Sequence, residues 1–127
     1  MLNGVSAGIV VMEVMRNAGG AAVDFSISGF NKSALDFIGQ SPDDVVSHTL
    51  LEAHPHLRIN GLFATYLRVL TTGEPAYEER HFDQPAPGYY AFFATRQIDA
   101  NGVVVMILNI TDRKNAEAQV IQTADIL

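Results

Sequence analysis

Four histidines are the side chains of this sequence that could ligate a metal or a haem iron. His54 and His56 are separated by one proline, so their imidazoles lie close together along the chain. That proline breaks the helix that would align the pair, and no cysteine is present to complete a zinc site. The other two histidines, His48 and His81, fall in separate segments. We therefore expect structural or surface histidines and no metal centre.

Carboxylates are the second group that could do chemistry. Glu78 and Glu79 are adjacent in a segment of strand character, so their side chains point to opposite faces and cannot act as a pair. Gly19 and Gly20 form a turn, since no glycine-rich pattern with a lysine follows them as in a phosphate-binding loop. The absence of cysteine excludes thiol nucleophiles and disulfides. We expect no catalytic residues and no enzyme activity in this domain.

Composition and charge favour one small domain. The chain has 127 residues, 48% of them hydrophobic, which suits a single core. The net charge is -6 and basic residues do not cluster, so we expect no nucleic-acid partner and no contact with a membrane. The first residues lack the basic start and the long apolar run of a signal peptide. A cytoplasmic domain cut from a longer chain is expected.

Strand and helix patterns alternate in blocks along the chain. Apolar and β-branched residues at 8–15 and alternating residues at 21–28 predict a hairpin closed by an Asn/Gly turn. Capping residues predict helices over 32–37 and 42–54, and an apolar stripe predicts a long helix over 56–72. Strands are expected over 75–82, 89–98 and 103–110. This order predicts an α+β fold with one five-stranded antiparallel sheet, helices between strands two and three, and a C-terminal linker helix.

The end of the last strand resembles a known signature. Residues 109–114 read Asn-Ile-Thr-Asp-Arg-Lys, followed by Ala116-Glu117. They resemble the Asp-Ile-Thr-x-Arg-Lys motif that ends many bacterial PAS domains and opens their output helix. Residues 30–34, 39–43 and 61–75 resemble the helix starts and the long helix of that family, in the same order. We identify the chain as a PAS-like domain over residues 1–111, with the start of a signalling helix at 112–127.

The resemblance implies that the helix after the last strand carries a signal. We expect the transmitting residues to be Asn109, Thr111, Asp112 and Arg113. The family's usual Asp at the first motif position is Asn109 here, which leaves an ion pair at that position in doubt. Thr111 or Asp112 is the expected helix cap.

The family's cavity, between the sheet and the long helix, gives a second set of candidates. We expect these bulky side chains to fill the core, and a pocket for a small apolar ligand is the alternative. The candidates are Phe63, Tyr66, Leu67, Leu70, Arg80, His81, Phe93, Arg96, Met106 and Leu108. No cofactor is expected, and the chain lacks the cysteine on which light-oxygen-voltage flavin photochemistry depends. Haem bound through His56 and non-covalent flavin remain alternatives.

Residues 89–95 and 103–108 are apolar at both alternations, so both faces of these strands should be covered. We expect a second copy of the chain to cover the outer face, with a flanking helix as the alternative. The residues assigned to this dimer face are Tyr90, Phe92, Val105 and Ile107.

The sequence thus predicts a sensory or dimerisation module of bacterial signal transduction. It would regulate an output domain in the same chain, a histidine kinase of a two-component system or a diguanylate cyclase. The alternative is a sensor that holds a ligand or haem in the cavity. A remote alternative is a small cavity enzyme of the ketosteroid-isomerase type, which would need a buried carboxylate with a raised pKa among Glu13, Asp24, Glu78 and Glu79.

Overall fold

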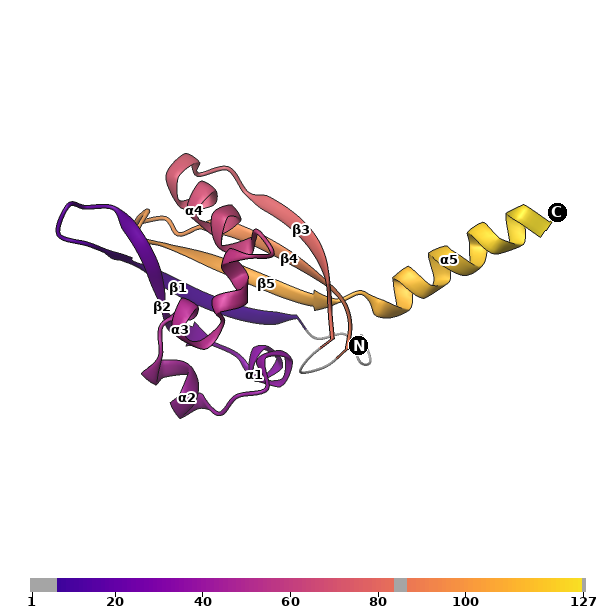
Figure 1. Ribbon diagram of the computed structural model, residues 1–127, viewed down its shortest axis with the longest axis horizontal. Coiled ribbons are helices and arrows are strands. Elements are labelled where there is room, and N and C mark those ends of the chain that lie inside the picture. The colour runs from indigo at the N-terminus through magenta and orange to yellow at the C-terminus, as the bar shows by residue number, and fades with distance from the viewer. Residues whose placement is uncertain (1–6, 84–86, 127) are drawn as a thin grey trace.

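A single five-stranded antiparallel sheet organises the protein (Figure 1). The computed structural model describes residues 7–83 and 87–126, with side chains described as far as Gln119. The strands lie in the order β2-β1-β5-β4-β3, and the bounds are β1 Gly8–Arg16, β2 Ala22–Phe30, β3 Ala76–Phe82, β4 Gly88–Arg96 and β5 Gly102–Asn109. The expected α+β architecture is confirmed.

The first hairpin forms as its turn residues predict. The Asn17 side-chain oxygen accepts hydrogen bonds from the backbone amides of Gly19 and Ala21, both at 3.0 Å. Gly20 takes a positive φ of 87°, which costs glycine little. The turn brings β1 and β2 into antiparallel register with Met12 opposite Ile27, so both side chains enter the core.

Short helices connect β2 to β3, and two of the expected helices are each divided in two. Residues 42–54 were expected to form one helix, but Thr49 and Glu52 form a capping box that starts a second helix. Residues 56–72 also break, because Gly61 takes a left-handed φ of 86° before the longest of these helices begins. The bounds are α1 Lys32–Ile38, α2 Pro42–Ser47, α3 Leu50–Ala53, the 3-10 helix η1 Pro55–Arg58 and α4 Leu62–Thr72.

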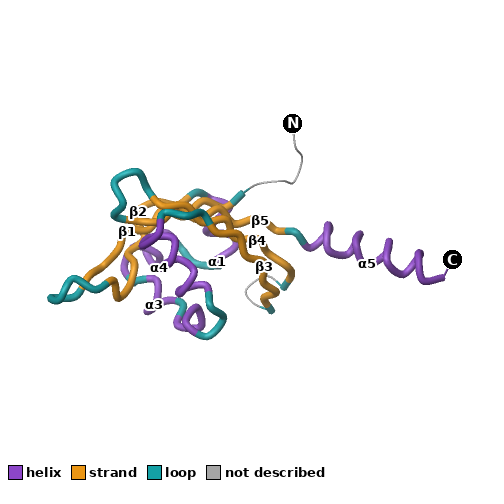
Figure 2. Tube along the Cα trace, turned by 90° about the horizontal axis from the view of Figure 1, so that it is seen from above, coloured by secondary structure: helices purple, strands orange, loops and turns teal. Residues whose placement is uncertain are grey.

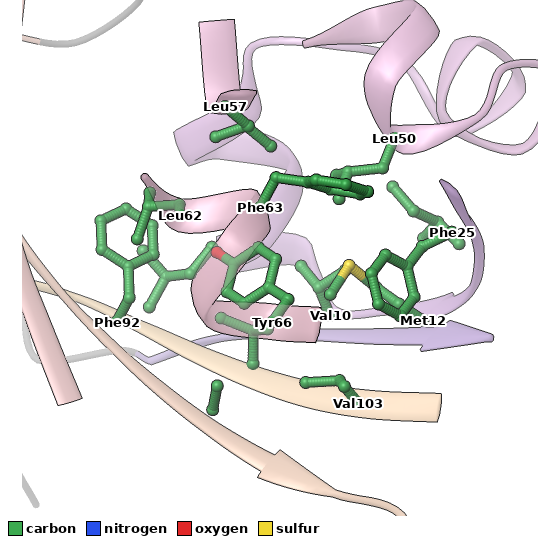
Figure 3. Packing of buried hydrophobic residues seen from close by; sticks show 14 of the residues in the cluster. Val10, Met12, Phe25, Leu50, Leu57, Leu62, Phe63, Tyr66, Phe92 and Val103 are labelled. Carbon is green, nitrogen blue, oxygen red and sulfur yellow. The ribbon is translucent and has the colours of Figure 1, made fainter. Parts of the chain in front are cut away.

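All of these helices cover the same face of the sheet (Figure 2). The core lies between them and the strands, where Phe25 of β2 meets Phe63 of α4 edge to face with ring centroids 6.0 Å apart (Figure 3). Helix α5 (Thr111–Ile126) is different, because it leaves the end of β5 and extends away from the sheet (Figure 1).

The expected assignment of β4 and β5 to inner and outer faces was wrong. The residues expected at an outer dimer face are buried in the core, namely Tyr90, Phe92, Val105 and Ile107. Phe93 and Met106, expected in the pocket, lie on the outer face and are 43% and 42% exposed. Successive side chains of a strand point to opposite faces, so one wrong choice of alternation inverts the whole strand. Both alternations are apolar here, and the pattern therefore could not decide between them.

Phe92 and Phe93 provide a matched test of this orientation. Phe92→Ala should lower the free energy of unfolding by about 3–5 kcal/mol, because it removes a ring that is 4% exposed from a packed core. Phe93→Ala should cost less than about 1.5 kcal/mol, because its ring is half exposed on the outer face. Urea unfolding of the two variants measures both values, and equal losses would contradict the assignment of faces.

Candidate functional site

A cavity of about 90 Å³ lies between the inner face of the sheet and the helices. Its walls are apolar side chains from both layers. Val10, Met12, Phe92, Val105 and Ile107 come from the sheet, and Phe37, Leu50 and Leu57 come from the helical segment. The polar side chains that reach it are those of His54, His56 and Tyr66. The cavity can therefore hold a small apolar group with few polar contacts.

Most of the expected pocket residues lie elsewhere. Of the ten candidates, Tyr66 is the one that lines the cavity. Phe63 and Leu70 are buried in the surrounding core, and Leu67 packs against it. Leu108 is half buried on β5, while His81 and Arg96 are exposed, as are the outward-facing Phe93 and Met106. The last candidate, Arg80, is half buried and donates through Nε to the Asn60 carbonyl at 3.1 Å.

The cavity residues that sequence reasoning missed come from β1 and β2, as with Val10, Met12 and Ile27, and from the short helices. Phe37 and Leu57 reach the cavity from α1 and η1, which pack over the inner face of the sheet. Phe37 lies 4.6 Å from the ring of Tyr90, measured between centroids. The adjacent apolar residues Phe37 and Ile38 in a short helix were the sequence feature that could have indicated a buried position there. Long-range packing decided that this pair faces the cavity.

The two neighbouring histidines lie where the cavity meets the surface. Their ring centroids are 5.8 Å apart, and His56 also meets Phe82 edge to face at 6.2 Å. Burial lowers the pKa of His54, and the nearby His56 lowers it further. His54 is therefore a neutral imidazole at neutral pH, able to donate or accept one hydrogen bond at each nitrogen according to its tautomer.

The cavity as it stands is small beside the larger cofactors considered from the sequence. An apolar cavity of about 150 Å³ holds one benzene molecule. A porphyrin or a three-ring flavin is far larger than the roughly 90 Å³ between these walls. Within the described residues, His, Cys, Asp and Glu side chains do not gather in a group of three or more that could hold a metal ion.

The isomerase-type alternative lacks the carboxylate base that it would need in the cavity. None of Glu13, Asp24, Glu78 and Glu79 is among the residues that line it. Asp24 instead accepts hydrogen bonds from the backbone amides of Phe25 and Leu51, at 2.7 and 3.1 Å. Because a general base must reach its substrate, these carboxylates cannot serve a molecule bound there.

The junction between β5 and α5 is a second candidate site. Hydrogen bonds attach the start of α5 to both β5 and β4. The Asn109 side-chain oxygen accepts from the Thr111 amide at 3.0 Å. The Thr111 hydroxyl accepts from the Tyr89 amide of β4 at 3.0 Å. Thr111 was expected to cap the helix, but the Asn109 side chain does so by accepting from the first helical amide. The Thr111 side chain instead joins the start of the helix to β4. Asp112, the other expected cap, is exposed.

Glu79 of β3 holds the first turn of α5 with a pair of cations. Its carboxylate oxygens lie 2.7 Å from Arg113 Nη2 and 2.7 Å from Lys114 Nζ. The Tyr77 hydroxyl donates to the same carboxylate at 2.7 Å. Hydrogen bonds from Lys114, Tyr77 and Arg113 lower the pKa of Glu79 to about 2. Asn109 carries no charge and cannot form an ion pair with α5. Glu79 of β3 forms one with Arg113 instead, although the two residues are 34 positions apart in the sequence.

An aromatic patch covers part of the outer sheet face. Tyr77, Tyr89, Phe93 and Met106 are all exposed there, from three neighbouring strands. We call these four side chains the outer patch. It lies on the opposite face from the cavity and beside the Glu79 junction.

A sequence profile of the PAS fold matches residues 23–115. The match covers most of the chain and includes the cavity helices and the junction. The chain belongs to the PAS family. No curated protein matches it. Within the described residues, no helix is long and apolar enough to cross a membrane.

Solved structures share this PAS fold, and 26 chains match. One is the structure of an RNA-binding light-oxygen-voltage receptor, with a TM-score of 0.57 and 22% sequence identity. The match covers 95% of the present chain and 33% of the receptor chain, so this chain spans about a third of that protein. At this identity the likeness shows the fold.

The RNA-binding receptor corrects one expectation. A net charge of -6 was taken to exclude a nucleic-acid partner. A protein that contains this fold is RNA-binding, so the exclusion was wrong. Net charge describes the average field of a domain, whereas binding depends on local surfaces and on the other parts of a longer chain.

The low pKa of Glu79 predicts how its contacts depend on pH. A carboxyl whose pKa is lowered in the folded state contributes stability that is complete above its ordinary pKa of 4.5 and is lost as pH falls towards about 2. The carboxyl carbon of Glu79, followed by NMR, should titrate with a midpoint near 2. Arg113→Ala should move that midpoint upward. A midpoint near 4.5 in the unsubstituted protein would contradict the ion-paired junction.

Proposed function

We propose that this PAS domain is a sensory module that passes changes in its sheet to an output domain through α5. The observation that carries the proposal is the polar junction of Glu79, Arg113 and Lys114. The side chains of residues 115–119 are all exposed, and the helix extends away from the sheet (Figure 1). Contacts in its first turn therefore set the direction of the helix, and a small movement of β3 or β4 would redirect it.

The cavity and the junction share the same strands. Phe37 packs on Tyr90, whose backbone neighbour Tyr89 binds Thr111. Tyr90 also lies opposite Asn109 in the register of β4 and β5. A molecule that displaced Phe37 would press on the strand ends where α5 begins. This contact chain supports ligand sensing as the input, and signalling measurements must test the coupling.

The output domain proposed for this module is a histidine kinase of a two-component system or a diguanylate cyclase, joined through α5. Either class could be controlled by the direction or rotation of a connecting helix. The polar, exposed surface of residues 115–119 supports a connecting role, because it gives the helix no apolar face there to bury against this domain.

Removal of the Glu79 charge should loosen the junction. Glu79→Gln keeps the shape of the side chain and loses both ion pairs with α5. Amides in the first turn of α5 should then exchange hydrogen a few-fold faster, as expected when partly exposed ion pairs are lost. In a fusion that continues α5 into a histidine kinase, autophosphorylation should change at least about twofold, since roughly 0.4 kcal/mol suffices for that change.

Glu78→Gln is the matched control for this variant. It removes a carboxylate from the neighbouring position of the same strand, where Glu78 pairs with Arg80 at 2.8 Å. Exchange in α5 and kinase output should both stay at the level of the unsubstituted protein. Equal effects of the two variants, or no effect of Glu79→Gln on output, would contradict signalling through this junction.

The dimerisation part of the proposal now rests on the outer patch. Four large apolar or aromatic side chains are exposed together on it, which is typical of a surface that a partner covers. A second copy of the chain could bring the same patch into a two-fold contact, in which each residue meets its symmetry-related partner surface.

The oligomeric state tests the outer patch directly. The unsubstituted chain should be a dimer at tens of micromolar by native mass spectrometry, and Phe93→Glu should make it monomeric by placing a charge in the contact. Val46→Glu is the control, because Val46 is also an exposed apolar residue but lies on α2, away from the patch. A monomeric unsubstituted chain would contradict dimerisation through this face.

A further inference from the structure

Two histidines begin the connection between α3 and α4, which spans residues 54–61. The rings of His54 and His56 lie edge to face, with their centroids 5.8 Å apart. His54 is half buried and His56 is exposed. Pro55 stands between them as the first residue of η1, and its ring fixes the backbone φ. The two imidazoles therefore stay close together as long as η1 keeps its place.

Backbone hydrogen bonds of this connection start at the same two residues. The His54 carbonyl accepts from the Leu57 amide at 3.1 Å, and the His56 carbonyl accepts from the Asn60 amide at 3.0 Å. The His56 ring also meets the Phe82 ring of β3 edge to face, at 6.2 Å between centroids. Separation of the two imidazoles would thus act on η1 and on its contact with the sheet.

Among the described residues, no opposite charge is directed at either ring. Apart from residues on the outer sheet face, the elements around the pair carry the ionisable side chains of Asp24 in β2, Lys32 and Asp36 in α1, Glu52 in α3, Arg58 in η1, Tyr66 and Arg68 in α4, and Glu78 and Arg80 in β3. Glu52 caps its own helix, and Glu78 pairs with Arg80 at 2.8 Å. Within the part of the chain that the structure describes, carboxylates do not come within ion-pair distance of His54 or His56. Protons taken up by the pair would therefore add charge without a counter-charge.

Protonation is costly while the connection stays closed. Burial lowers the pKa of His54, and the nearby His56 lowers it further. A charge on His54 would lose hydration against the apolar cavity walls, and a charge on His56 would repel it. Both costs fall once the rings separate in water. Since the pKa of His54 in the closed connection lies below the ordinary 6.5, the closed form is most stable above that pH and loses stability as the pH falls.

We propose that residues 54–61 form an acid-sensing site, in which proton uptake by His54 and His56 opens η1 and releases it from Phe82. The ligand of this site is the proton, so no molecule has to enter the cavity. Phe82 lies on β3, the strand whose Glu79 holds α5. Opening would therefore reach the α5 junction, and this effect on output rests on the function proposed above.

Hydrogen exchange of the full chain, followed by NMR, measures the opening. Protection factors of the Leu57 and Asn60 amides, which correct for the intrinsic pH dependence of exchange, are compared about one pH unit above and below the ordinary histidine value of 6.5. They should fall at least about twofold at the lower pH. Each proton that only the open form binds contributes up to about tenfold.

Glutamine variants show whether the pair causes this response, because glutamine is polar but takes up no proton. His54→Gln and His56→Gln should each weaken the pH dependence of the protection factors, and the double variant should abolish it. His48→Gln is the matched control, since His48 lies on the neighbouring segment and its ring contacts the Ser47 hydroxyl and the Asp44 carbonyl. This control should keep the full response. An unchanged pH dependence in the double variant, or an equal loss in the control, overturns the proposal.

Ring titration gives a second readout that leaves His54 in place. The Hε1 signal of His54 should titrate with a midpoint below 6.5, and replacing the exposed His56 by glutamine should move that midpoint upward by removing the like charge. A midpoint at or above 6.5, or one that His56→Gln leaves unchanged, would show that protonation does not strain the pair and would overturn the proposal.

Kinase output separates the acid site from the route through α5. In the fusion with a histidine kinase, the change of autophosphorylation between the two pH values should be smaller in His54→Gln than in the unsubstituted protein. If the change is equal while Glu79→Gln alters output, acid is not an input and signalling through α5 stands. If the protection factors respond to pH as expected while Glu79→Gln leaves output unchanged, the acid-sensing site stands and the proposed route is rejected.

Discussion

The alternation of side chains across one antiparallel sheet is the constraint on which this structure depends. Helices cover a single face, so one alternate set of residues from each strand enters the core and the other set stays outside (Figure 2). This division places Phe92 beside the cavity and its neighbour Phe93 in the outer patch. The cavity, the outer patch and the base of α5 thereby all draw on β4 and β5, the cavity from one face of the sheet and the outer patch from the other.

The helical segment turns the inner face into a site. A long continuous helix over residues 56–72 would pack along the sheet as one rod, but Gly61 breaks it. The capping box of Thr49 and Glu52 also divides the preceding helix. The resulting short elements place Phe37 and Leu57 around the cavity. The pieces leave a space of about 90 Å³ in an otherwise packed core, and such spaces are uncommon at native packing density.

Electrostatics have a different role at the α5 junction. The helix has little apolar surface against the domain, since residues 115–119 are exposed. Its first turn is held by Glu79 and by hydrogen bonds to β4. Contacts of this kind are individually modest and depend on geometry, whereas apolar burial is not directional. A junction built from them can be stable in one arrangement and still respond to a small shift between strands.

The sequence by itself determined the strands and the family, whereas two of the expected helices are each divided in the structure. Turn residues such as Asn17 and caps such as Asn31 act within a few residues of themselves, so their effects are readable locally. The motif at residues 109–114 also lies in one segment, and the PAS assignment that it suggested is confirmed. Tertiary structure alone decided which face of β4 and β5 is buried, because both alternations are apolar. It also decided that Glu79 meets Arg113, since a pairing across 34 residues depends on the register of every intervening strand.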